Sequence, residues 1–418
     1  MTMPMIIALA VTVLMIILIM VDKLPFGAPP LLALLLLVVL GVTDIKTAFG
    51  GFSNSTIVML ASFMAIMAAL QKTSFIVKFR EMMYKMAGHG GFKAYVALIL
   101  IVMLGCSLFG TGSTAYYVLT IGLLSTLPYS KQLPPSKVLM PAGFAANHPL
   151  LPFNTALQYG IVVAVLESAG VIANVNLVKF TFVNVALSLG FFVWCLLAYK
   201  IMPDHPIAEA TEEAKANQTA VSTLPHNKEI ITYICFVVAV VGMLLQSVIG
   251  DAGYALTGLA VGGLLVFGIM DFTEIRNAIS APIILMSAGV IGIADALGNT
   301  GLTALVGQTV ANMLGMNVNP FILIFVFCVL TSVLATLTGS TIGTVYVFAP
   351  MAIATCVSLG LDPTAAAAAI VISGWCGHFL PIDGMPAMIM GAGNYTMKEF
   401  WKFTIPQYFI RLLFLTVG

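Results

Sequence analysis

Two identical stretches of four residues combine glycine with small hydroxyl side chains inside long apolar runs. They are Thr111-Gly112-Ser113-Thr114 and Thr338-Gly339-Ser340-Thr341, at a spacing of 227 residues. Glycine favours the end of a helix, and serine or threonine caps the N-terminus of the next one. Each stretch therefore predicts a helix that ends, turns and begins again. The N–H groups and hydroxyls at such a restart can bind an anion.

Two interruptions that contain proline break other apolar runs. Residues 147–155 read Asn-His-Pro-Leu-Leu-Pro-Phe-Asn-Thr, and residues 377–386 read Gly-His-Phe-Leu-Pro-Ile-Asp-Gly-Met-Pro. Proline lacks the backbone donor and breaks the helical ladder, so the freed carbonyl groups need other partners. We expect residues of these interruptions to join the two glycine-containing stretches in one binding site, namely Asn154, Thr155 and Pro386.

Three ionisable side chains lie in the same interruptions: His148, His378 and Asp383. An ionisable group at membrane depth is costly and marks a functional site by default. Because a carboxylate repels an anion unless it is protonated or paired, we expect Asp383 to serve a coupling cation; alternatively, it caps the helix that restarts beside it. The histidines either take part in proton coupling or are satisfied buried residues. The expected cation-coupling residues are Ser113, Ser340, Asp383, His148 and His378, with any sodium ion near Gly112 and Gly339.

The composition places these candidates in a membrane protein. Of the 418 residues, 60% are apolar and 8% are charged, whereas soluble domains carry about 25% charged residues. Most of the chain must therefore face lipid or other apolar helices, and we expect it in the inner (cytoplasmic) membrane of a bacterium. The net charge of +1 implies no nucleic-acid partner. The six cysteines occur singly and predict neither a disulfide framework nor a metal site.

Apolar runs predict the helices that position the candidate residues, for example at 4–20, 56–70 and 178–200. The connector 72–93 carries five lysine or arginine residues against one glutamate, which predicts a cytoplasmic location. The chain then reaches the first glycine-containing stretch and returns to a second lysine-bearing connector, as a re-entrant hairpin would. We expect no arginine or lysine inside a span, so an anion would be held by helix N-termini and hydroxyls.

The second half of the chain repeats the first. An offset of 227 residues carries Asp44 onto Asp271 and one Thr-Gly-Ser-Thr stretch onto the other. We predict a first repeat at 1–200 with its hairpin tip at 111–114 and broken helix at 147–155, and a polar linker at 201–228. The second repeat covers 229–418, with its tip at 338–341 and broken helix at 377–386.

Each repeat would cross the membrane five times, an odd number that requires the repeats to be inverted. The segment 299–320 corresponds to the basic connector but has no charged residue, which favours opposite sides of the membrane. The predicted fold is an all-α polytopic membrane protein with two inverted repeats of five transmembrane helices each plus two re-entrant hairpins. Inverted repeats are typical of secondary transporters that bind substrate between the repeats.

Several longer stretches resemble the divalent-anion/sodium symporter family of the ion-transporter superfamily. They are Gly51-Phe52-Ser53-Asn54-Ser55-Thr56, Ala68-Ala69-Leu70-Gln71-Lys72-Thr73, and the region from Pro350 through Leu361-Asp362-Pro363 to Gly391-Ala392-Gly393-Asn394-Tyr395-Thr396. The resemblance implies a homodimer in which a mobile transport part moves like an elevator against a scaffold part. In that family each hairpin tip carries Ser-Asn-Thr, which binds the substrate carboxylate and helps to form sodium sites. The Thr-Gly-Ser-Thr tips of this chain are similar to the citrate–metal/proton branch of the superfamily, whose tips contain Gly-Ser-Thr.

These features predict a secondary active transporter, not an enzyme, that carries small organic anions by an elevator mechanism. The expected substrates are di- or tricarboxylates such as succinate, malate or citrate, coupled to sodium or protons. The alternatives are an anion exchanger or a transporter of a sulfate-like oxyanion or a sulfonate. A channel or a membrane-embedded enzyme is less favoured, because the chain has no HExxH motif, nucleophile elbow or Walker loop. The expected partners are the small anion, the lipid bilayer and a second copy of the chain, with no cofactor other than a coupling ion.

Overall fold

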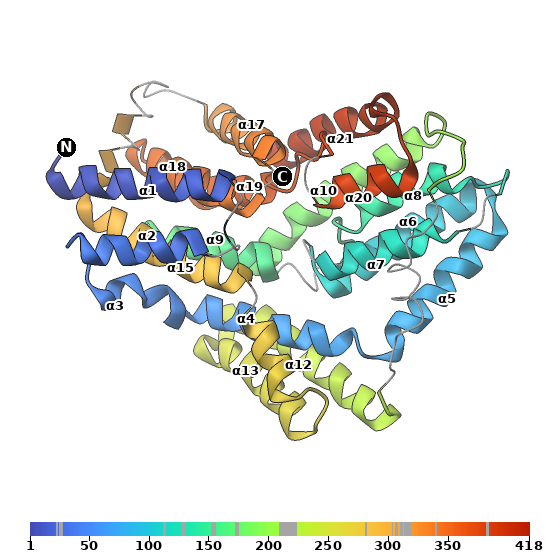
Figure 1. Cartoon of the computed structure of the whole chain (residues 1–418), viewed down its shortest axis with the longest axis horizontal. Coiled ribbons are helices and arrows are strands. Elements are labelled where there is room, and N and C mark those ends of the chain that lie inside the picture. The colour runs from blue at the N-terminus through green and yellow to red at the C-terminus, as the bar shows by residue number, and fades with distance from the viewer. Residues whose placement is uncertain are drawn as a thin grey trace. The chain divides into compact units, whose positions relative to one another are not determined.

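The computed structural model describes residues 1–21, 24, 28–111, 114–127, 130–151, 156–171, 175–208, 224–280, 282–302, 304–305, 308–309, 312, 319–338, 341–381 and 384–418. Within these ranges the regular secondary structure is helical and contains no strand (Figure 1). The all-helical fold agrees with the sequence prediction. Helices α1 (Met3–Val21), α4 (Ser55–Leu70) and α10 (Leu177–Ala198) each match a predicted apolar run to within two residues.

The chain divides into two compact units that do not follow the order of the sequence. Unit 1 comprises Met1–Ile66, Gln158–Phe180 and Val237–Trp375, and unit 2 comprises Met67–Leu157, Thr181–Phe236 and Cys376–Gly418. Helices α4, α10 and α12 (His226–Ile249) each have residues in both units. Each unit therefore contains residues from both predicted repeats.

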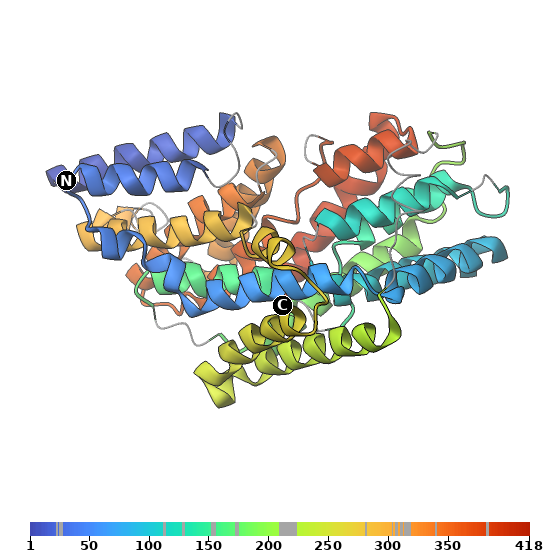
Figure 2. The same cartoon turned by 60° about the horizontal axis from the view of Figure 1, so that its bottom comes forward.

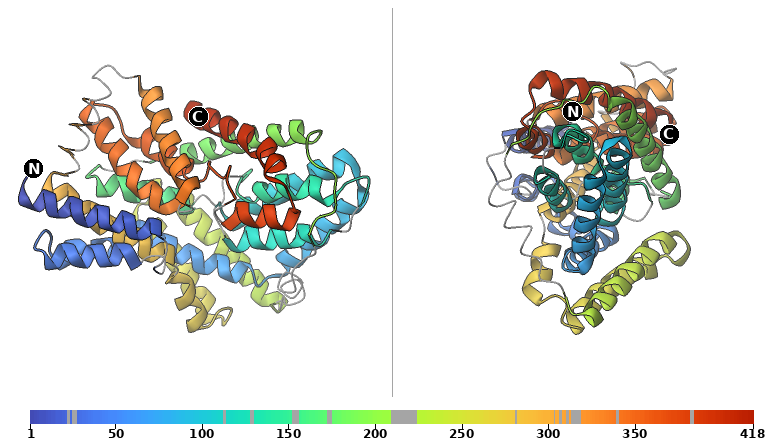
Figure 3. Two further views of the ribbon diagram at one scale, coloured as in Figure 1. Left: turned by 45° about the horizontal axis from the view of Figure 1, so that its top comes forward. Right: turned by 90° about the vertical axis from the view of Figure 1, so that its right-hand side faces the viewer.

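Unit 1 contains two groups of packed helices. In the first group, α1 lies beside α2, and both pack against α15 (Figures 1 and 2). In the second, α17, α18 and α19 pack against one another (Figure 3). The remaining bounds in this unit are α2 (Ala28–Val39), α3 (Ile45–Ala48), η1 (Gly50–Ser53), α9 (Ala156–Ser168), α13 (Asp251–Val266), α14 (Phe272–Ile279), α15 (Pro282–Thr300), α17 (Pro320–Thr338), α18 (Thr341–Ser358) and α19 (Thr364–Ser373).

Glycine allows the backbone of α15 to approach the α3–η1 segment. A Cβ atom added to Gly51 would collide with the carbonyl group of Ala288, and one added to Gly292 would collide with that of Ala48. Small residues at such contacts let helix backbones come close enough for extensive van der Waals packing. The contact explains why two glycines lie at these positions in otherwise apolar segments.

Helix starts recur at the spacing that the sequence predicts for the repeat. Asp44 caps α3 by accepting a hydrogen bond from the Thr47 amide (2.9 Å), and Asp271 caps α14 by accepting one from the Glu274 amide (2.7 Å). An aspartate at the N-cap satisfies one of the free N–H groups of the first turn. The two caps are 227 residues apart in the sequence, as are the first residues of α4 and α15. The inverted orientation of the repeats remains a prediction.

Unit 2 is built around α8 (Pro135–Ala145). Helices α6 (Gly91–Phe109), α7 (Thr114–Ser125) and α20 (Gly384–Gly393) all pack against it, and α5 (Ser74–His89) packs against α6. The first interruption follows α8 of unit 2, and the chain then continues as α9, which lies mostly in unit 1. The second follows α19 of unit 1, and the chain then continues as α20 in unit 2. The two interruptions therefore exchange helices between the units in a reciprocal way.

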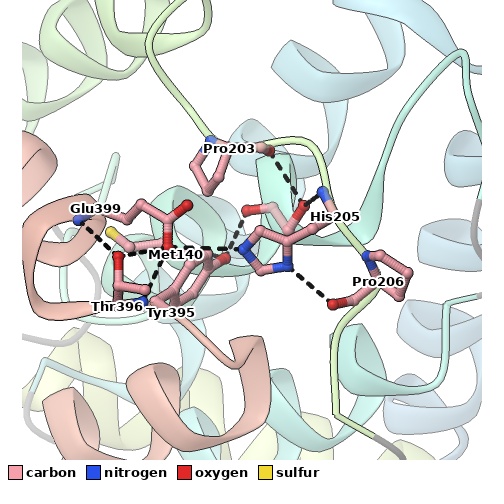
Figure 4. A network of polar contacts seen from close by, with 8 residues as sticks. Met140, Pro203, His205, Pro206, Tyr395, Thr396 and Glu399 are labelled. Atoms are coloured by element: carbon pink, nitrogen blue, oxygen red, sulfur yellow. Dashed lines mark hydrogen bonds and ion pairs between the residues drawn. The ribbon is translucent and has the colours of Figure 1, made fainter.

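A polar network attaches α21 (Met397–Val417) and the chain after α10 to α8 (Figure 4). The Tyr395 hydroxyl donates to the Ser136 carbonyl (2.5 Å) and accepts from the Met140 amide (3.0 Å). The Ser136 hydroxyl donates to the Pro203 carbonyl (3.1 Å) and accepts from the His205 amide (3.0 Å). The network fixes the start of the predicted linker within unit 2.

Several helices are apolar and long enough to cross a membrane. Among the residues described, four stretches meet both conditions: Gly91–Phe109, Leu177–Ala198, His226–Met243 and Pro320–Leu337. Large apolar side chains on α10 and α21 are exposed, such as Phe182 at 69% and Phe409 at 62%. An exposed apolar face of this kind suits contact with lipid. The predicted total of ten spans remains a prediction.

Candidate functional site

Both glycine-containing stretches lie at junctions between helices. Helix α6 ends at Phe109 and α7 begins at Thr114, while α17 ends at Thr338 and α18 begins at Thr341. Thr111 is buried in unit 2, and within the described part of the structure its hydroxyl has no hydrogen-bond partner. Thr341 is half-buried in unit 1. The predicted site residues Gly112, Ser113, Gly339 and Ser340 lie outside the described residues, as do the side chains of Thr114 and Thr338.

The first interruption obtains its hydrogen bonds from α6. After α8 ends, the amide groups of Leu150 and Leu151 donate to the Ser107 hydroxyl at 2.8 and 2.9 Å. Ser107 in turn donates to the Met103 carbonyl at 3.0 Å. This serine supplies the partners that non-helical backbone needs when it is removed from water. The predicted site residues Asn154 and Thr155 lie outside the described residues.

The second interruption contains a residue in an unusual backbone conformation. His378 has a φ angle of +59°, in the left-handed region that side chains other than glycine seldom adopt. The following carbonyl, of Phe379, accepts a hydrogen bond from the Trp401 indole at 2.9 Å. Pro386 is buried near the start of α20, and Asp383 lies outside the described residues. Unusual backbone geometry of this kind is concentrated at functional sites.

The structure places the two predicted histidines around a shared aromatic residue in unit 2. His148 is 1% exposed, its Nδ1 donates to the Phe144 carbonyl at 2.8 Å, and its ring stacks on Phe191 with 3.7 Å between centroids. His378 is 6% exposed, and its ring centroid lies 6.2 Å from that of Phe144. Because Nδ1 of His148 carries the hydrogen that it donates, Nε2 is the nitrogen left for other interactions. Within the described residues it has no partner.

Helix α21 contains a buried arginine that the sequence analysis did not single out. Arg411 is 1% exposed. Its guanidinium hydrogen-bonds to Cys376 and acts electrostatically on both His148 and His378. Helix α21 is not one of the four described stretches that are long and apolar enough to cross a membrane, so the absence of arginine and lysine from the spans stays a prediction. The sequence signal for this residue is a single arginine flanked on both sides by apolar residues in the last apolar run.

Aromatic side chains enclose this cluster. The rings of Phe144 and Phe403 lie 6.0 Å apart, and those of Phe191 and Phe403 lie 6.5 Å apart. Such a shell excludes water and lowers the local dielectric constant, which strengthens the field of a buried charge. We refer to Arg411, His148, His378 and Cys376 as the Arg411 cluster.

A second polar contact lies in unit 1 and has a structural explanation. The Asn54 side-chain amide donates to the Glu167 carboxylate at 2.6 Å, and its oxygen accepts from the Ile57 amide at the start of α4 (3.4 Å). Asn54 therefore caps the start of α4. Asp295 is half-buried in α15, where the charge of Glu167 acts on it. Among the residues described, no three histidine, cysteine or acidic side chains are arranged to hold a metal ion.

Comparison with known proteins connects this architecture to transport. A family model described as "Citrate transporter" matches residues 16–373. The chain belongs to the citrate transporter family. The match supports the ion-transporter superfamily that the sequence resembles, but it is to the citrate transporter family and not to the divalent-anion/sodium symporter family. The hairpin tips stay a prediction. A membrane transporter, and not an enzyme, is the class that the family establishes.

Individual relatives are distant. The uncharacterized transporter YfbS of Escherichia coli (strain K12) is 24% identical over 196 residues, and the match covers 47% of this chain and 30% of the relative. The chain thus matches under a third of the length of this curated relative.

Two solved transporters share the fold. The Alcanivorax borkumensis YdaH transporter has a TM-score of 0.66 at 16% identity, with 100% of this chain and 97% of that chain covered. Neisseria gonorrhoeae MtrF, described as belonging to a class of antimetabolite efflux pumps, has a TM-score of 0.59 at 13% identity, with 100% and 94% covered. At these identities the likeness concerns the fold alone.

Proposed function

We propose that this membrane transporter is a secondary active transporter of small organic anions. The substrates are di- or tricarboxylates such as succinate, malate or citrate. The observation that carries the proposal is the pair of Thr-Gly-Ser-Thr stretches at corresponding helix junctions, before α7 and α18, in a member of the citrate transporter family. A helix N-terminus offers free N–H groups and about half a positive charge. Two such termini with threonine and serine hydroxyls suit a carboxylate.

In this proposal the roles of the predicted site residues stay as the sequence suggests. Substrate contacts come from both tips and from Asn154, Thr155 and Pro386, while Asp383, His148 and His378 serve the coupling ion, sodium or a proton. Both histidines are buried near Arg411 in unit 2. The protein works as a homodimer with ten spans and an elevator-like movement.

Exchange and transport of another oxyanion, sulfate-like or a sulfonate, are the alternatives. Exchange requires anion on the opposite side of the membrane, whereas ion-coupled symport requires only a sodium or proton gradient. Sulfate differs from dicarboxylates in geometry, so competition assays with unlabelled anions separate the two substrate classes.

Uptake by purified protein in proteoliposomes tests the proposal. Labelled citrate and succinate should enter saturably under a sodium or pH gradient. Replacement of Gly112 or Gly339 by leucine should reduce uptake by about a hundredfold, because a bulky side chain at the tip displaces the anion from the groups that bind it. Gly262→Leu in α13 is the matched control, because no atom lies within 4 Å of a Cβ at this position. Normal uptake by both tip variants, or no uptake of any carboxylate by the wild type, would contradict the proposal.

A further inference from the structure

Arg411 is a buried cation for which the described part of unit 2 supplies no carboxylate partner. Its side chain is 1% exposed, and the only hydrogen bond attributed to it there is with Cys376. Nε and Nη1 are buried and have no hydrogen-bond partner in the described residues. An ion pair elsewhere in unit 2 joins His205 and Glu399 and does not involve this arginine. Two of the three guanidinium nitrogens therefore have N–H groups without an acceptor among the described residues.

Burial of this guanidinium is energetically unfavourable unless an anion pairs with it. The guanidinium cannot lose its proton in a protein, so the charge persists after burial. A buried charge costs several kcal/mol unless it is paired and hydrogen-bonded. A thiol is a weak acceptor and does not neutralise the charge. The missing component is an acceptor with a negative charge, and a carboxylate bonds to guanidinium N–H groups with charge-assisted hydrogen bonds.

The surroundings of Arg411 are apolar and keep the guanidinium 1% exposed. His148 comes from the segment after α8, and His378 comes from the second interruption. Their rings lie against those of Phe191 and Phe144. The field of Arg411 reaches both imidazoles. The site thus places one permanent positive charge beside two imidazoles in apolar surroundings.

We infer that Arg411 binds a carboxylate group of the transported anion. The inference rests on the proposed function and adds to it a specific side chain that the sequence analysis did not single out. It assigns recognition of a negative charge to α21, in addition to the helix N-termini at the tips. The ligand class is a small carboxylate with the charge of at least one ionised carboxyl group.

Ligand-induced stabilisation of the full chain in detergent tests the inference. Citrate and succinate are titrated against wild type, Arg411→Lys and Arg411→Gln while the melting temperature is recorded. Lysine keeps the charge but loses the planar donor set, so the half-saturating concentration should rise about tenfold. Glutamine removes the charge, and the rise should be about a hundredfold. Arg276→Gln is the matched control, since Arg276 lies on the short helix α14 and is exposed; it should leave the concentration unchanged.

A neutral ligand tests whether charge is what Arg411 recognises. Succinamide has the shape of succinate without its charge, so wild type should prefer succinate strongly and Arg411→Gln should lose that preference. If Arg411→Gln fails to fold, Arg411→Lys decides the question, because it keeps a charged side chain of similar size. Citrate affinities equal to wild type in these variants would overturn the inference.

An internal counter-ion is the competing explanation. Asp383 lies outside the described residues and belongs to the same interruption as His378. If its carboxylate neutralised Arg411, then Asp383→Asn would destabilise the wild type but not Arg411→Gln, and citrate binding would not depend on Arg411. That result would overturn the inference and leave the proposed function intact. Wild-type protein that neither binds nor transports any carboxylate would instead refute the proposed function itself.

Discussion

Ser107 is the side chain that permits the backbone to leave helical geometry after α8. Its hydroxyl is fully buried, accepts two amide hydrogen bonds and donates one. A hydroxyl has two lone pairs and one hydrogen, so all of its capacity is used. The interruption that carries His148 depends on this one atom for two of its amide groups.

Replacement of Ser107 by alanine should therefore destabilise unit 2. The amides of Leu150 and Leu151 would lose their acceptor, and an unsatisfied polar group costs about 1–3 kcal/mol. Chemical unfolding in detergent, followed by tryptophan fluorescence, measures the change in the free energy of unfolding. Ser62→Ala is the control, because Ser62 is also buried but only donates to the carbonyl of its own helix, at Val58. Equal losses in the two variants would show that the Ser107 bonds have no special role.

The residues of the candidate site were predictable to different degrees. His148 and His378 stood out because an ionisable side chain in an interrupted apolar run is unusual, and the structure brings both into one cluster. Arg411 was missed because sequence alone does not reveal whether a helix face meets lipid or protein. That difference decides whether a cation is excluded or retained. The contacts of the tip glycines belong to residues outside those described, so their role remains a prediction.

At the scale of elements, α8 is held by a hydroxyl from another helix start. Tyr395 bonds both to the Ser136 carbonyl and to the Met140 amide, a pair four residues apart that an α-helix normally joins directly. The buried ring of Tyr395 therefore couples the start of α21, which carries Arg411, to the helix that precedes His148.

Tyr395→Phe should weaken this connection while keeping the ring. Loss of the hydroxyl removes hydrogen bonds but no apolar packing, so it should cost about 1 kcal/mol, whereas Tyr395→Ala should cost about 3–5 kcal/mol because it also leaves a cavity. Thermal unfolding of the purified protein measures both. Tyr84→Phe is the control, since Tyr84 is exposed and bonds to Thr126. A phenylalanine variant as unstable as the alanine variant would show that the hydroxyl, not the ring, holds the elements together.

The positions of helices were easier to predict than their packing. Long apolar runs ended by polar residues fix α1, α4 and α10 almost to the residue, because burial of backbone in an apolar environment forces helix formation. The packing of α20 against α7 and α8 joins residues more than two hundred positions apart. Local sequence does not determine which helix packs against which other helix, since every apolar run carries similar side chains.

At the scale of the whole molecule, compact units and sequence repeats are different divisions of the same chain. The predicted repeats end at residues 200 and 418, whereas each unit takes segments from both. A repeat is defined by similar sequence, whereas a unit is defined by close contacts. The reciprocal exchange of helices at the two interruptions is therefore compatible with the repeat. The repeat predicts that equivalent connectors lie on opposite sides of the membrane.

Labelling of introduced cysteines tests on which side of the membrane each connector lies. Lys85 and Asn312 are exposed and differ by 227 residues, the offset of the repeat. In oriented vesicles a membrane-impermeant maleimide should reach Lys85→Cys only from the cytoplasmic side and Asn312→Cys only from the other side, because the basic connector is held inside. Lys398→Cys should label from the same side as Lys85→Cys. The six native cysteines are buried, so background labelling should be low. Labelling of Lys85→Cys and Asn312→Cys from one side would mean that the repeats are parallel, and the inverted-repeat architecture would have to be abandoned.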